Sequence, residues 1–570
     1  MTAYDLKCAL KHKLKTYDRN GVSEICEQLI SNLYEPATPF DVKTGKEIMR
    51  DLRNNLQFDL VQQVGEALIL TNRSNFTIRK LYAQSLIDQN FLAAAISVLN
   101  QLISDAQHEP DTNMEAKAEE MEARGLLGRS FKQIYINKYG AANPNLHAFL
   151  QLAIKTYYEV YDTNRTVFTW HGINVVALLI RAKKDKITID TKFDPLELAT
   201  AILQVIEAKY DRQEADAWDF ATAAEACIAL QDAKNALEWI SGYARMPYID
   251  AFQLRSTLRQ LEEVWQLDVN SEMGSLLLPI IRAELLKSQG GTVVIDANDV
   301  QYQKTITKTY QQLINAVEVT DNSTARLEKV FSYDSFSSYD WYKTGIDRCL
   351  AVARIGRETN KGMGTGFLLQ GKALHEKLGT ELVLITNAHV VSNDPAENKK
   401  GALHSDEAVV IFEILNYQEK FTIKEIIWSS PSTELDVTIL RFDEEGLVRL
   451  QKLTENIAIY PVSLYQPMVS NEKANNRIYI IGHPAGGTLQ LSLYDNVLLD
   501  SEDPRIHYRT PTIGGSSGSP VFNQNWQLIG LHHAGSKDMP MLNGKPGRYE
   551  ANEGIWIQAI KRGLSDFFEH

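Results

Sequence analysis

Residues 514–522 read GGSSGSPVF. A serine between glycines can occupy a tight turn whose backbone amides point inward. A carbonyl oxygen that becomes negative in a tetrahedral intermediate needs such donors, and we predict that the amides of Gly515 and Ser517 supply them. The turn makes Ser517 a candidate nucleophile, but Gly-Ser-rich loops are common, so its role depends on groups elsewhere in the chain.

Two upstream segments contain the groups that would activate this serine. His389 follows the apolar run 382–385, and Asp436 begins the apolar run 436–440. A carboxylate at the start of an apolar strand can orient an imidazole and stabilise its protonated form. The chain order His, Asp, Ser is that of chymotrypsin, not of subtilisin or the α/β-hydrolases. The spacing leaves room for His389 and Asp436 in one barrel and Ser517 in the next.

These segments resemble those of trypsin-like serine proteases. Residues 386–389 (TNAH) resemble that family's histidine motif, residues 364–367 (GTGF) the strand before it, and residues 482–486 (GHPAG) a turn of bacterial-type members. The resemblance spans about residues 351–560. It implies an all-β double-barrel domain that hydrolyses proteins through an acyl-enzyme, without a metal or an organic cofactor. Many short strand-like runs over this region suit that architecture.

The residues around the serine also bear on specificity. Pro511 stands where enzymes that cleave after Arg or Lys carry an acidic residue, so we do not expect a trypsin-like preference. Thr512 and His532, with Gly535 beyond, resemble the substrate-binding residues of glutamyl endopeptidases. That resemblance implies cleavage after Glu, or after Gln or Asp. The alternative is that His532 packs structurally and the pocket accepts small or apolar residues.

In the region before about residue 290, the apolar residues follow a different periodicity. Apolar residues recur at helical spacing in residues 81–99, and a second helix pair is predicted at 217–230 and 233–243. Small residues at the expected contact positions suit close stacking of helix hairpins, as in tetratricopeptide-like solenoids. They are Ala83, Ala95, Ala226 and Ala236.

Two stretches of this region go beyond generic helix. Residues 122–135 and 171–179 resemble the TRAF-binding helical domain of stress-activated kinases and its bacterial relatives, over about residues 55–295. In bacteria, such domains resemble sensor modules attached to effector enzymes of antiviral systems. Arg124, Arg129 and Lys132 are candidates for binding an anion on one concave surface. The alternative is that they are solvated charges on a helix face.

We predict four segments: an N-terminal helical segment (1–54), a tetratricopeptide-like helical domain (55–295), a connector (296–345) and a trypsin-like protease domain (346–570). A chain of 570 residues is too long for a single core. Its net charge of −13 and its lack of a long basic run argue against nucleic acid as the main partner. The expected partners are a protein substrate and a small nucleotide or protein activator of the helical region.

The cysteines and the chain start bear on location. Cys8, Cys26, Cys227 and Cys349 are far apart and form no metal-type pair, and such scarcity fits a reducing cytoplasm. We see no signal-peptide pattern and no apolar run of membrane-spanning length, so we expect a cytoplasmic protein. Two alternatives to a regulated protease remain: an interaction scaffold with an inactive protease-like domain, and a housekeeping protease whose repeats serve only assembly.

Overall fold

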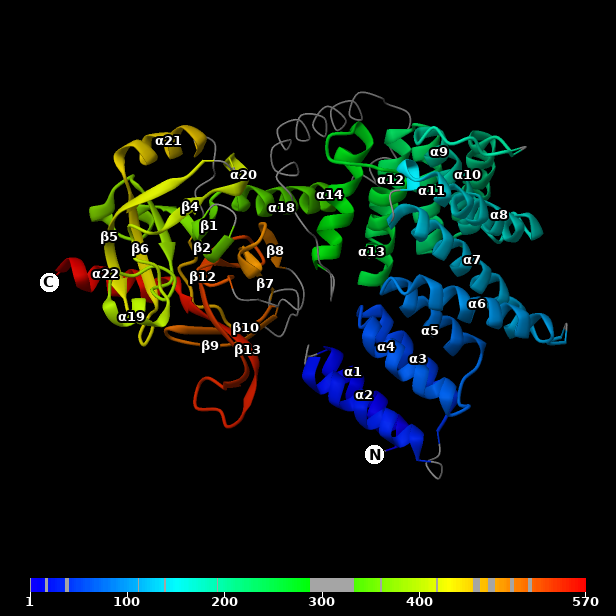
Figure 1. Cartoon of the computed structure of the whole chain (residues 1–570), viewed down its shortest axis with the longest axis horizontal. Coiled ribbons are helices and arrows are strands. Elements are labelled where there is room, and N and C mark those ends of the chain that lie inside the picture. Colours follow the sequence, from blue (N-terminus) through cyan, green and yellow to red (C-terminus); the bar gives the residue numbers. More distant parts are fainter. Residues whose placement is uncertain are drawn as a thin grey trace. The chain divides into compact units, whose positions relative to one another are not determined.

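The chain folds into two compact units, drawn in Figure 1, one from residues 2–287 and one from residues 337–569. The computed structural model describes residues 2–15, 19–35, 40–110, 112–137, 140–191, 193–287, 333–358, 361–416, 419–454, 462–469, 477–492, 497–510 and 515–569. Most of the predicted connector lies outside these residues. Over the part described, no helix has both the length and the apolarity that a bilayer crossing requires.

The first unit is helical. Its helices are α1 (Ala3–Lys15), α2 (Arg19–Tyr34), α3 (Val42–Asn54), α4 (Phe58–Leu70), α5 (Phe76–Asp88), α6 (Leu92–Gln107), α7 (Met114–Asn137), α8 (His147–Thr163), α9 (Thr169–Lys184), α10 (Pro195–Asp211), α11 (Ala217–Ala229), α12 (Ala233–Ala244), α13 (Ala251–Arg259) and α14 (Glu272–Lys287). Most successive helices pack against each other, as do α4 with α5, α6 with α7, and α11 with α12 (Figure 1). The predicted helical-repeat region is therefore confirmed.

Local chemistry sets the helix ends and close packing follows from small side chains. Asp216 and Asp250 accept hydrogen bonds from backbone amides at the starts of α11 and α13, which satisfies donors that the helix leaves unpaired. Short turns separate the paired helices, with Asn90 and Gln231 in the left-handed region at φ 67° and 58°. The four alanines predicted at contact positions are fully buried.

The second unit contains a six-stranded closed barrel and a seven-stranded antiparallel sheet. The barrel order is β1-β2-β3-β6-β5-β4, and the sheet order is β8-β7-β11-β12-β13-β10-β9. The strands are β1 (Val352–Glu358), β2 (Lys361–Gln370), β3 (Leu382–Thr386), β4 (Val409–Ile411), β5 (Phe421–Ser430), β6 (Val437–Phe442), β7 (Ile478–Gly482), β8 (Gln490–Ser492), β9 (Val497–Glu502), β10 (Arg505–Arg509), β11 (Pro520–Asn523), β12 (Leu528–Pro540) and β13 (Arg548–Trp556).

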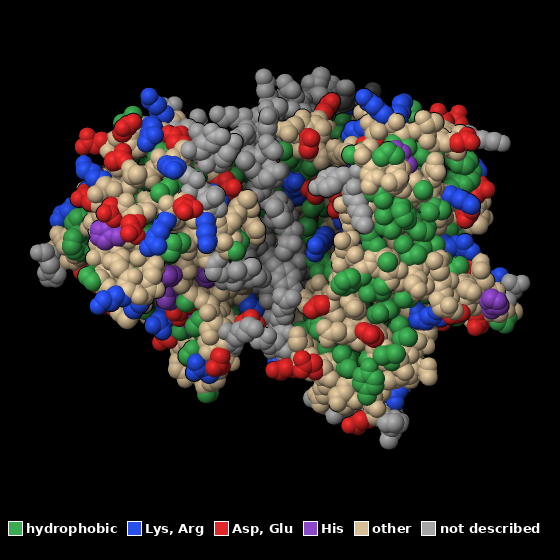
Figure 2. All heavy atoms as spheres, viewed as in Figure 1, with side chains coloured by type: hydrophobic (Ala, Val, Ile, Leu, Met, Phe, Trp, Pro, Cys, Tyr) green, Lys and Arg blue, Asp and Glu red, His purple; other side chains and the backbone are tan. Residues whose placement is uncertain are grey.

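Helices flank these strands, as Figure 1 shows: α18 (Tyr333–Cys349), α19 (Pro395–Lys400), α20 (Glu413–Asn416), α21 (Glu444–Thr454) and α22 (Ile557–Glu569). The prediction of an all-α region followed by an all-β protease-like domain is confirmed. Figure 2 shows Lys and Arg interspersed with Asp and Glu over the visible face, with no broad area of one sign.

Candidate active site

His389 and Asp436 are joined where β3 ends and β6 begins. His389 Nδ1 lies 2.7 Å from Asp436 Oδ2, and the His389 backbone amide donates to Asp436 Oδ1 at 3.1 Å. Asn387 Nδ2 donates to the backbone carbonyl of Asp436. Asp436 is in the left-handed region, at φ 46°, and its side chain is 1% exposed. The carboxylate therefore holds both the ring and the backbone of the histidine, and His389 Nδ1 carries the shared proton.

Thr365 of β2 fastens the loop that contains Ser517. Its backbone amide donates to the Ser517 carbonyl at 2.8 Å, and its hydroxyl donates to the Gly515 carbonyl at 2.9 Å. The Thr365 carbonyl in turn accepts from the hydroxyl of Thr386, which ends β3. A residue of the barrel thus ties the serine loop, which precedes β11 of the sheet, to the strand that leads to His389.

Two glycines allow the loop this path. Gly515 and Gly518 have φ values of 97° and 87°, a conformation that residues with a Cβ rarely adopt. A Cβ on Gly518 would lie 1.9 Å from the Thr365 carbonyl oxygen, and one on Gly515 would lie 2.5 Å from the backbone nitrogen of Gly486. The glycines are therefore required by close backbone approach as well as by φ.

The Ser517 hydroxyl and the two predicted oxyanion donors are free to meet a substrate. Within the described part of the chain, the amides of Gly515 and Ser517 have no protein acceptor, so both can donate to a carbonyl oxygen. Over the same residues, Ser517 Oγ and His389 are not hydrogen-bonded to each other. Catalytic hydrogen bonds often tighten only when substrate is bound.

A second imidazole contacts the same carboxylate. His533 Nδ1 lies 2.8 Å from Asp436 Oδ2, and its Nε2 lies 2.9 Å from Glu553 Oε1. A ring whose two nitrogens both face carboxylates must donate from both, so His533 is an imidazolium. Burial lowers the pKa of His533, but its hydrogen bonds to Asp436 and Glu553 outweigh burial and raise the pKa to about 9.

The contacts beyond His533 form a chain across the sheet. Glu553 Oε2 lies 2.8 Å from His507 Nε2, and His507 Nδ1 lies 2.8 Å from the Tyr549 hydroxyl. Arg505 is 3.6 Å from the same oxygen of Glu553. Burial raises the pKa of Asp436 and of Glu553, yet their hydrogen bonds to histidines bring both pKa values down to about 2. Both carboxylates are therefore charged around neutral pH.

His532 faces a different partner. Its Nδ1 lies 2.8 Å from the Tyr508 hydroxyl, and burial, together with the charges of His533 and His389, lowers the pKa of His532 to about 3. The ring is thus neutral at pH 7. Gly535 lies in β12, paired with Asn552 of β13. Thr512, the other predicted specificity residue, lies outside the described residues.

Sequence reasoning assigned no role to several of these groups. Tyr508, His507 and Glu553 stand in no motif, and only the position of His533 beside His532 could have marked it. Thr365 belongs to the quoted 364–367 segment, but its side-chain contact with the serine loop is a feature of the tertiary structure. Among the described residues, no group of His, Cys, Asp and Glu is arranged to hold a metal ion.

The structure separates the three anion-site candidates of the helical unit. Arg124 pairs with Glu120 on its own helix at 2.9 Å. Arg129 and Lys132 both line a cavity inside this unit, and Arg124 is not part of the lining. Arg129 pairs with Asp88, and Lys132 Nζ donates to the side-chain carbonyl of Asn174.

Family models match both units. Residues 364–531 match the trypsin-like peptidase domain, and residues 54–179 match Tetratricopeptide Repeats-Sensor, a sensor family of such repeats. An uncharacterised protein of Sinorhizobium fredii is 27% identical over 220 residues, which is 36% of this chain. The chain spans about a third of that relative's length, since the match covers 31% of it.

Solved structures with low overall similarity include two proteases. A serine endoprotease from Yersinia pestis is 14% identical, with a TM-score of 0.27, over 40% of this chain and 66% of that one. A Glu endopeptidase is 16% identical, with a TM-score of 0.26, over 38% of this chain and 89% of that one. Such values do not bear on which bond this chain cleaves.

Proposed function

We propose that this chain, which joins a trypsin-like peptidase domain to a tetratricopeptide-like sensor domain, is a regulated intracellular serine endopeptidase. The observation that carries the proposal is the hydrogen bond between the partly exposed His389 and the buried Asp436, together with the hydrogen bonds of Thr365 to the loop of Ser517. The order of the three residues in the chain and the glycine turn are weaker support, because neither places His389 near Ser517. The four cysteines are free thiols, which supports a reducing compartment.

In the proposed mechanism, His389 Nε2 takes the proton of Ser517 as its oxygen attacks a peptide carbonyl. Asp436 stabilises the imidazolium that forms, and the amides of Gly515 and Ser517 stabilise the oxyanion. His389 then protonates the leaving amine, and an acyl-enzyme remains on Ser517. Water activated by His389 releases the acyl group.

Ser517→Ala tests the proposal directly. We expect this change to abolish labelling of the full chain by a fluorophosphonate, which reacts with an activated serine, while the melting temperature is preserved. Ser516→Ala is the matched control, because the neighbouring hydroxyl has no role in the mechanism. Equal labelling of wild type and Ser517→Ala would remove Ser517 from its role. No labelling of the wild type, either alone or with saturating AMP, would instead favour the inactive scaffold.

We further propose that the enzyme cleaves after Glu, or after Gln or Asp, with His532 at the base of the pocket. The support is the buried, neutral imidazole whose Nδ1 lies 2.8 Å from the Tyr508 hydroxyl. In the tautomer that this pocket requires, the phenol donates to Nδ1 and the ring proton is on Nε2. That N–H can then donate to a side-chain oxygen of the substrate. A pocket for apolar side chains would not need one fixed tautomer of His532, because an apolar side chain accepts no hydrogen bond.

Tyr508→Phe is the corresponding test. Loss of the phenol leaves the tautomer of His532 unfixed, so we expect kcat/KM for substrates with Glu or Gln before the cleaved bond to fall about tenfold, or ~1.4 kcal/mol. The measurement is a peptide series that varies only this residue. Preference of the wild type for Leu or Ala at that position would defeat the proposal.

We also propose that the helical region senses a signal or recruits the substrate. The support is the match of residues 54–179 to the sensor repeat family. The resemblance of residues 55–295 to modules of bacterial antiviral systems favours a role in defence. The competing function, a housekeeping protease with repeats for assembly only, is separated from this one by whether the helical unit controls the reactivity of Ser517.

A further inference from the structure

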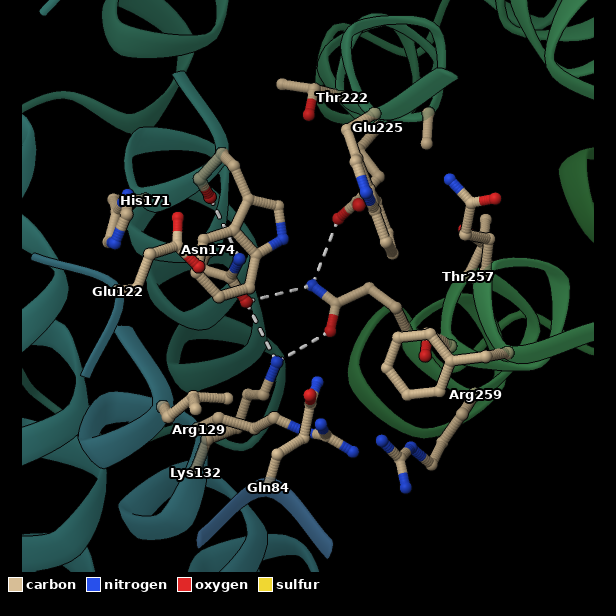
Figure 3. Close-up of a pocket in the computed structure, with 18 of the residues that line it drawn as sticks. Gln84, Glu122, Arg129, Lys132, His171, Asn174, Thr222, Glu225, Thr257 and Arg259 are labelled. Carbon is tan, nitrogen blue, oxygen red and sulfur yellow. Dashed lines mark hydrogen bonds between the residues drawn. The ribbon is translucent and has the colours of Figure 1, made fainter. Parts of the chain in front are cut away.

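The helical unit contains a partly open cavity of about 490 Å³, a size that suits a small organic ligand. Its walls come from α3, α5, α7, α9, α11 and α13, and from the residues that follow α13. Figure 3 shows the polar side chains of these helices converging on the cavity. The cavity lies wholly within this unit, so its walls do not depend on the protease unit.

One side of the cavity carries more positive charge than its nearest carboxylate balances. Arg129 of α7 and Arg259 of α13 point toward the same space in Figure 3, and both contact the single carboxylate of Asp88. Two guanidinium groups thus share one counter-charge. Lys132, one helical turn from Arg129, adds a third cation at this side.

Lys132 is buried without a carboxylate in hydrogen-bond contact, over the residues that the structure describes. Its Nζ donates to Asn174 Oδ1 and Gln260 Oε1, each at 2.8 Å, and these are neutral amide oxygens. Burial and the charge of Arg129 lower the pKa of Lys132 to about 7. A buried ammonium group of this kind is stabilised when an anion reaches it.

Aromatic side chains line the cavity as well. Phe168 and Trp170 belong to the start of α9 and Trp218 to the start of α11, and all three are partly exposed. Large aromatic faces at a cavity wall bind planar rings by stacking. Cations and indoles that line one cavity therefore fit a ligand that has both an anionic group and a planar ring.

Two acidic residues of the lining, Glu225 and Glu263, accept hydrogen bonds from protein donors. Glu225 accepts from Trp265 Nε1 at 2.8 Å and from Gln260 Nε2 at 3.0 Å. Glu263 accepts from Gln133 Nε2 at 3.1 Å. These two carboxylates can accept hydrogen bonds from ligand hydroxyl or amino groups, and in Figure 3 Glu225 lies across the cavity from Arg129.

We propose that this cavity binds a small organic anion with a planar ring, its anionic group between Arg129, Lys132 and Arg259 and its ring against Trp170 or Trp218. A mononucleotide is the simplest molecule with both features. The proposal does not rest on protease activity and stands or falls by binding alone. It favours a small ligand over a protein activator because the cavity has the volume of a small molecule and all of its lining belongs to one unit.

The test is calorimetric titration of the full Ser517→Ala chain with AMP, adenosine and inorganic phosphate. We expect AMP to bind at least about tenfold more tightly than either adenosine or phosphate, because it fills both parts of the cavity. Lys132→Met should weaken AMP about tenfold or more and leave adenosine unchanged. Trp218→Leu should weaken both AMP and adenosine if the ring lies on α11, and Trp170→Leu if it lies on α9.

Two controls keep the result interpretable. Lys155→Met removes an exposed lysine of α8, 72% exposed and outside the lining, and should leave AMP binding unchanged. If Lys132→Met fails to fold, as judged by circular dichroism, Arg259→Gln takes its place with the same expected loss. The absence of AMP binding at millimolar concentration, equal affinity for AMP and phosphate, or unchanged AMP binding in the cation variants overturns the proposal.

Discussion

Asp436 is the residue on which the barrel and the sheet converge. It accepts from His389, next to its own strand in the barrel, and from His533 on β12 of the sheet. A carboxylate held from both sides cannot rotate away from the imidazole of His389, and the cation at His533 offsets the cost of burying the charge of Asp436. Glu553 accepts from the other nitrogen of the His533 ring. The charges of Asp436, His533 and Glu553 therefore alternate in sign.

The raised pKa of His533 makes stability depend on pH. The pKa of His533 in the folded protein, about 9, lies above the ordinary value of 6.5. Its contribution to the free energy of unfolding is therefore fully present below pH 6.5 and is lost as the pH rises through 9. At pH 6 we expect the free energy of unfolding of His533→Gln to be lower than that of wild type by up to ~3 kcal/mol. By pH 9.5 the difference between the two proteins should be smaller. Urea unfolding across this pH range measures the difference.

Glu553→Gln is the companion variant, because it leaves the imidazole of His533 in place and removes one of its two carboxylates. At pH 6 the free energy of unfolding of Glu553→Gln should lie below that of wild type, by less than for His533→Gln. This difference should also shrink by pH 9.5. A gap between wild type and His533→Gln that is constant from pH 6 to 9.5 would contradict the assignment of His533 as an imidazolium.

At the scale of elements, the loop of residues 515–519 is hydrogen-bonded to both β2 and β12. The Gly518 amide donates to the His532 carbonyl, and the Ser517 carbonyl accepts from Thr365. Both contacts are made by backbone atoms, so they place the loop independently of side-chain rotamers. The loop of Ser517 is therefore positioned by backbone hydrogen bonds to one strand of the barrel and one strand of the sheet.

Gly518→Ala tests these backbone contacts. Its Cβ would meet the Thr365 carbonyl at 1.9 Å, and its φ of 87° is strained for alanine, so the loop must move. We expect loss of fluorophosphonate labelling and destabilisation by at least about 2 kcal/mol. Thermal unfolding and labelling measure the two effects.

Gly544→Ala is the matched control, since Gly544 also has a positive φ, 63°, but no atom lies within 4 Å of an added Cβ. The control should lose only the smaller cost of backbone strain and keep its labelling. Equal effects of the two changes would show that strain, and not the approach of β2, accounts for the requirement at Gly518.

At the scale of the whole molecule, the two units have separate cores and separate sites. The helical core clusters contain residues from α1 to α7, and the sheet core is built from β7, β9, β10, β11 and β12. A sensor function therefore requires that ligand binding in one unit alter reactivity in the other, which is a coupling free energy between sites.

We expect saturating AMP to raise the rate of fluorophosphonate labelling of Ser517 in the full chain about tenfold, a coupling of ordinary size. Lys132→Met, which weakens AMP binding, should shift this increase to higher AMP concentrations. An unchanged labelling rate with AMP bound would assign the helical unit to assembly or substrate recruitment. Binding and coupling are measured separately, so either can fail alone.

Much of this architecture could be predicted from local pattern. Helical periodicity and small residues indicated the repeat unit, and short apolar runs indicated the β unit, because these signals arise from neighbours within a few residues. His389 and Asp436 could be named because each stands at the end of an apolar run inside a recognisable segment. Gly518 could be expected because a tight turn constrains its own backbone.

The remaining features depend on contacts between residues far apart in the chain. The pairing of β12 with β13 and of β13 with β10 sets His533 and His507 against Glu553, and none of these three residues shares a motif with another. Arg124 and Lys132 are equivalent in a helix read as sequence, yet only Lys132 faces the cavity, since the neighbouring helices decide which side is enclosed. The sequence by itself determined the unit types and the catalytic candidates, because these follow from local chemistry. The histidine–carboxylate chain and the enclosed cavity were decided by the tertiary structure, because long-range strand register and helix packing alone bring their members together.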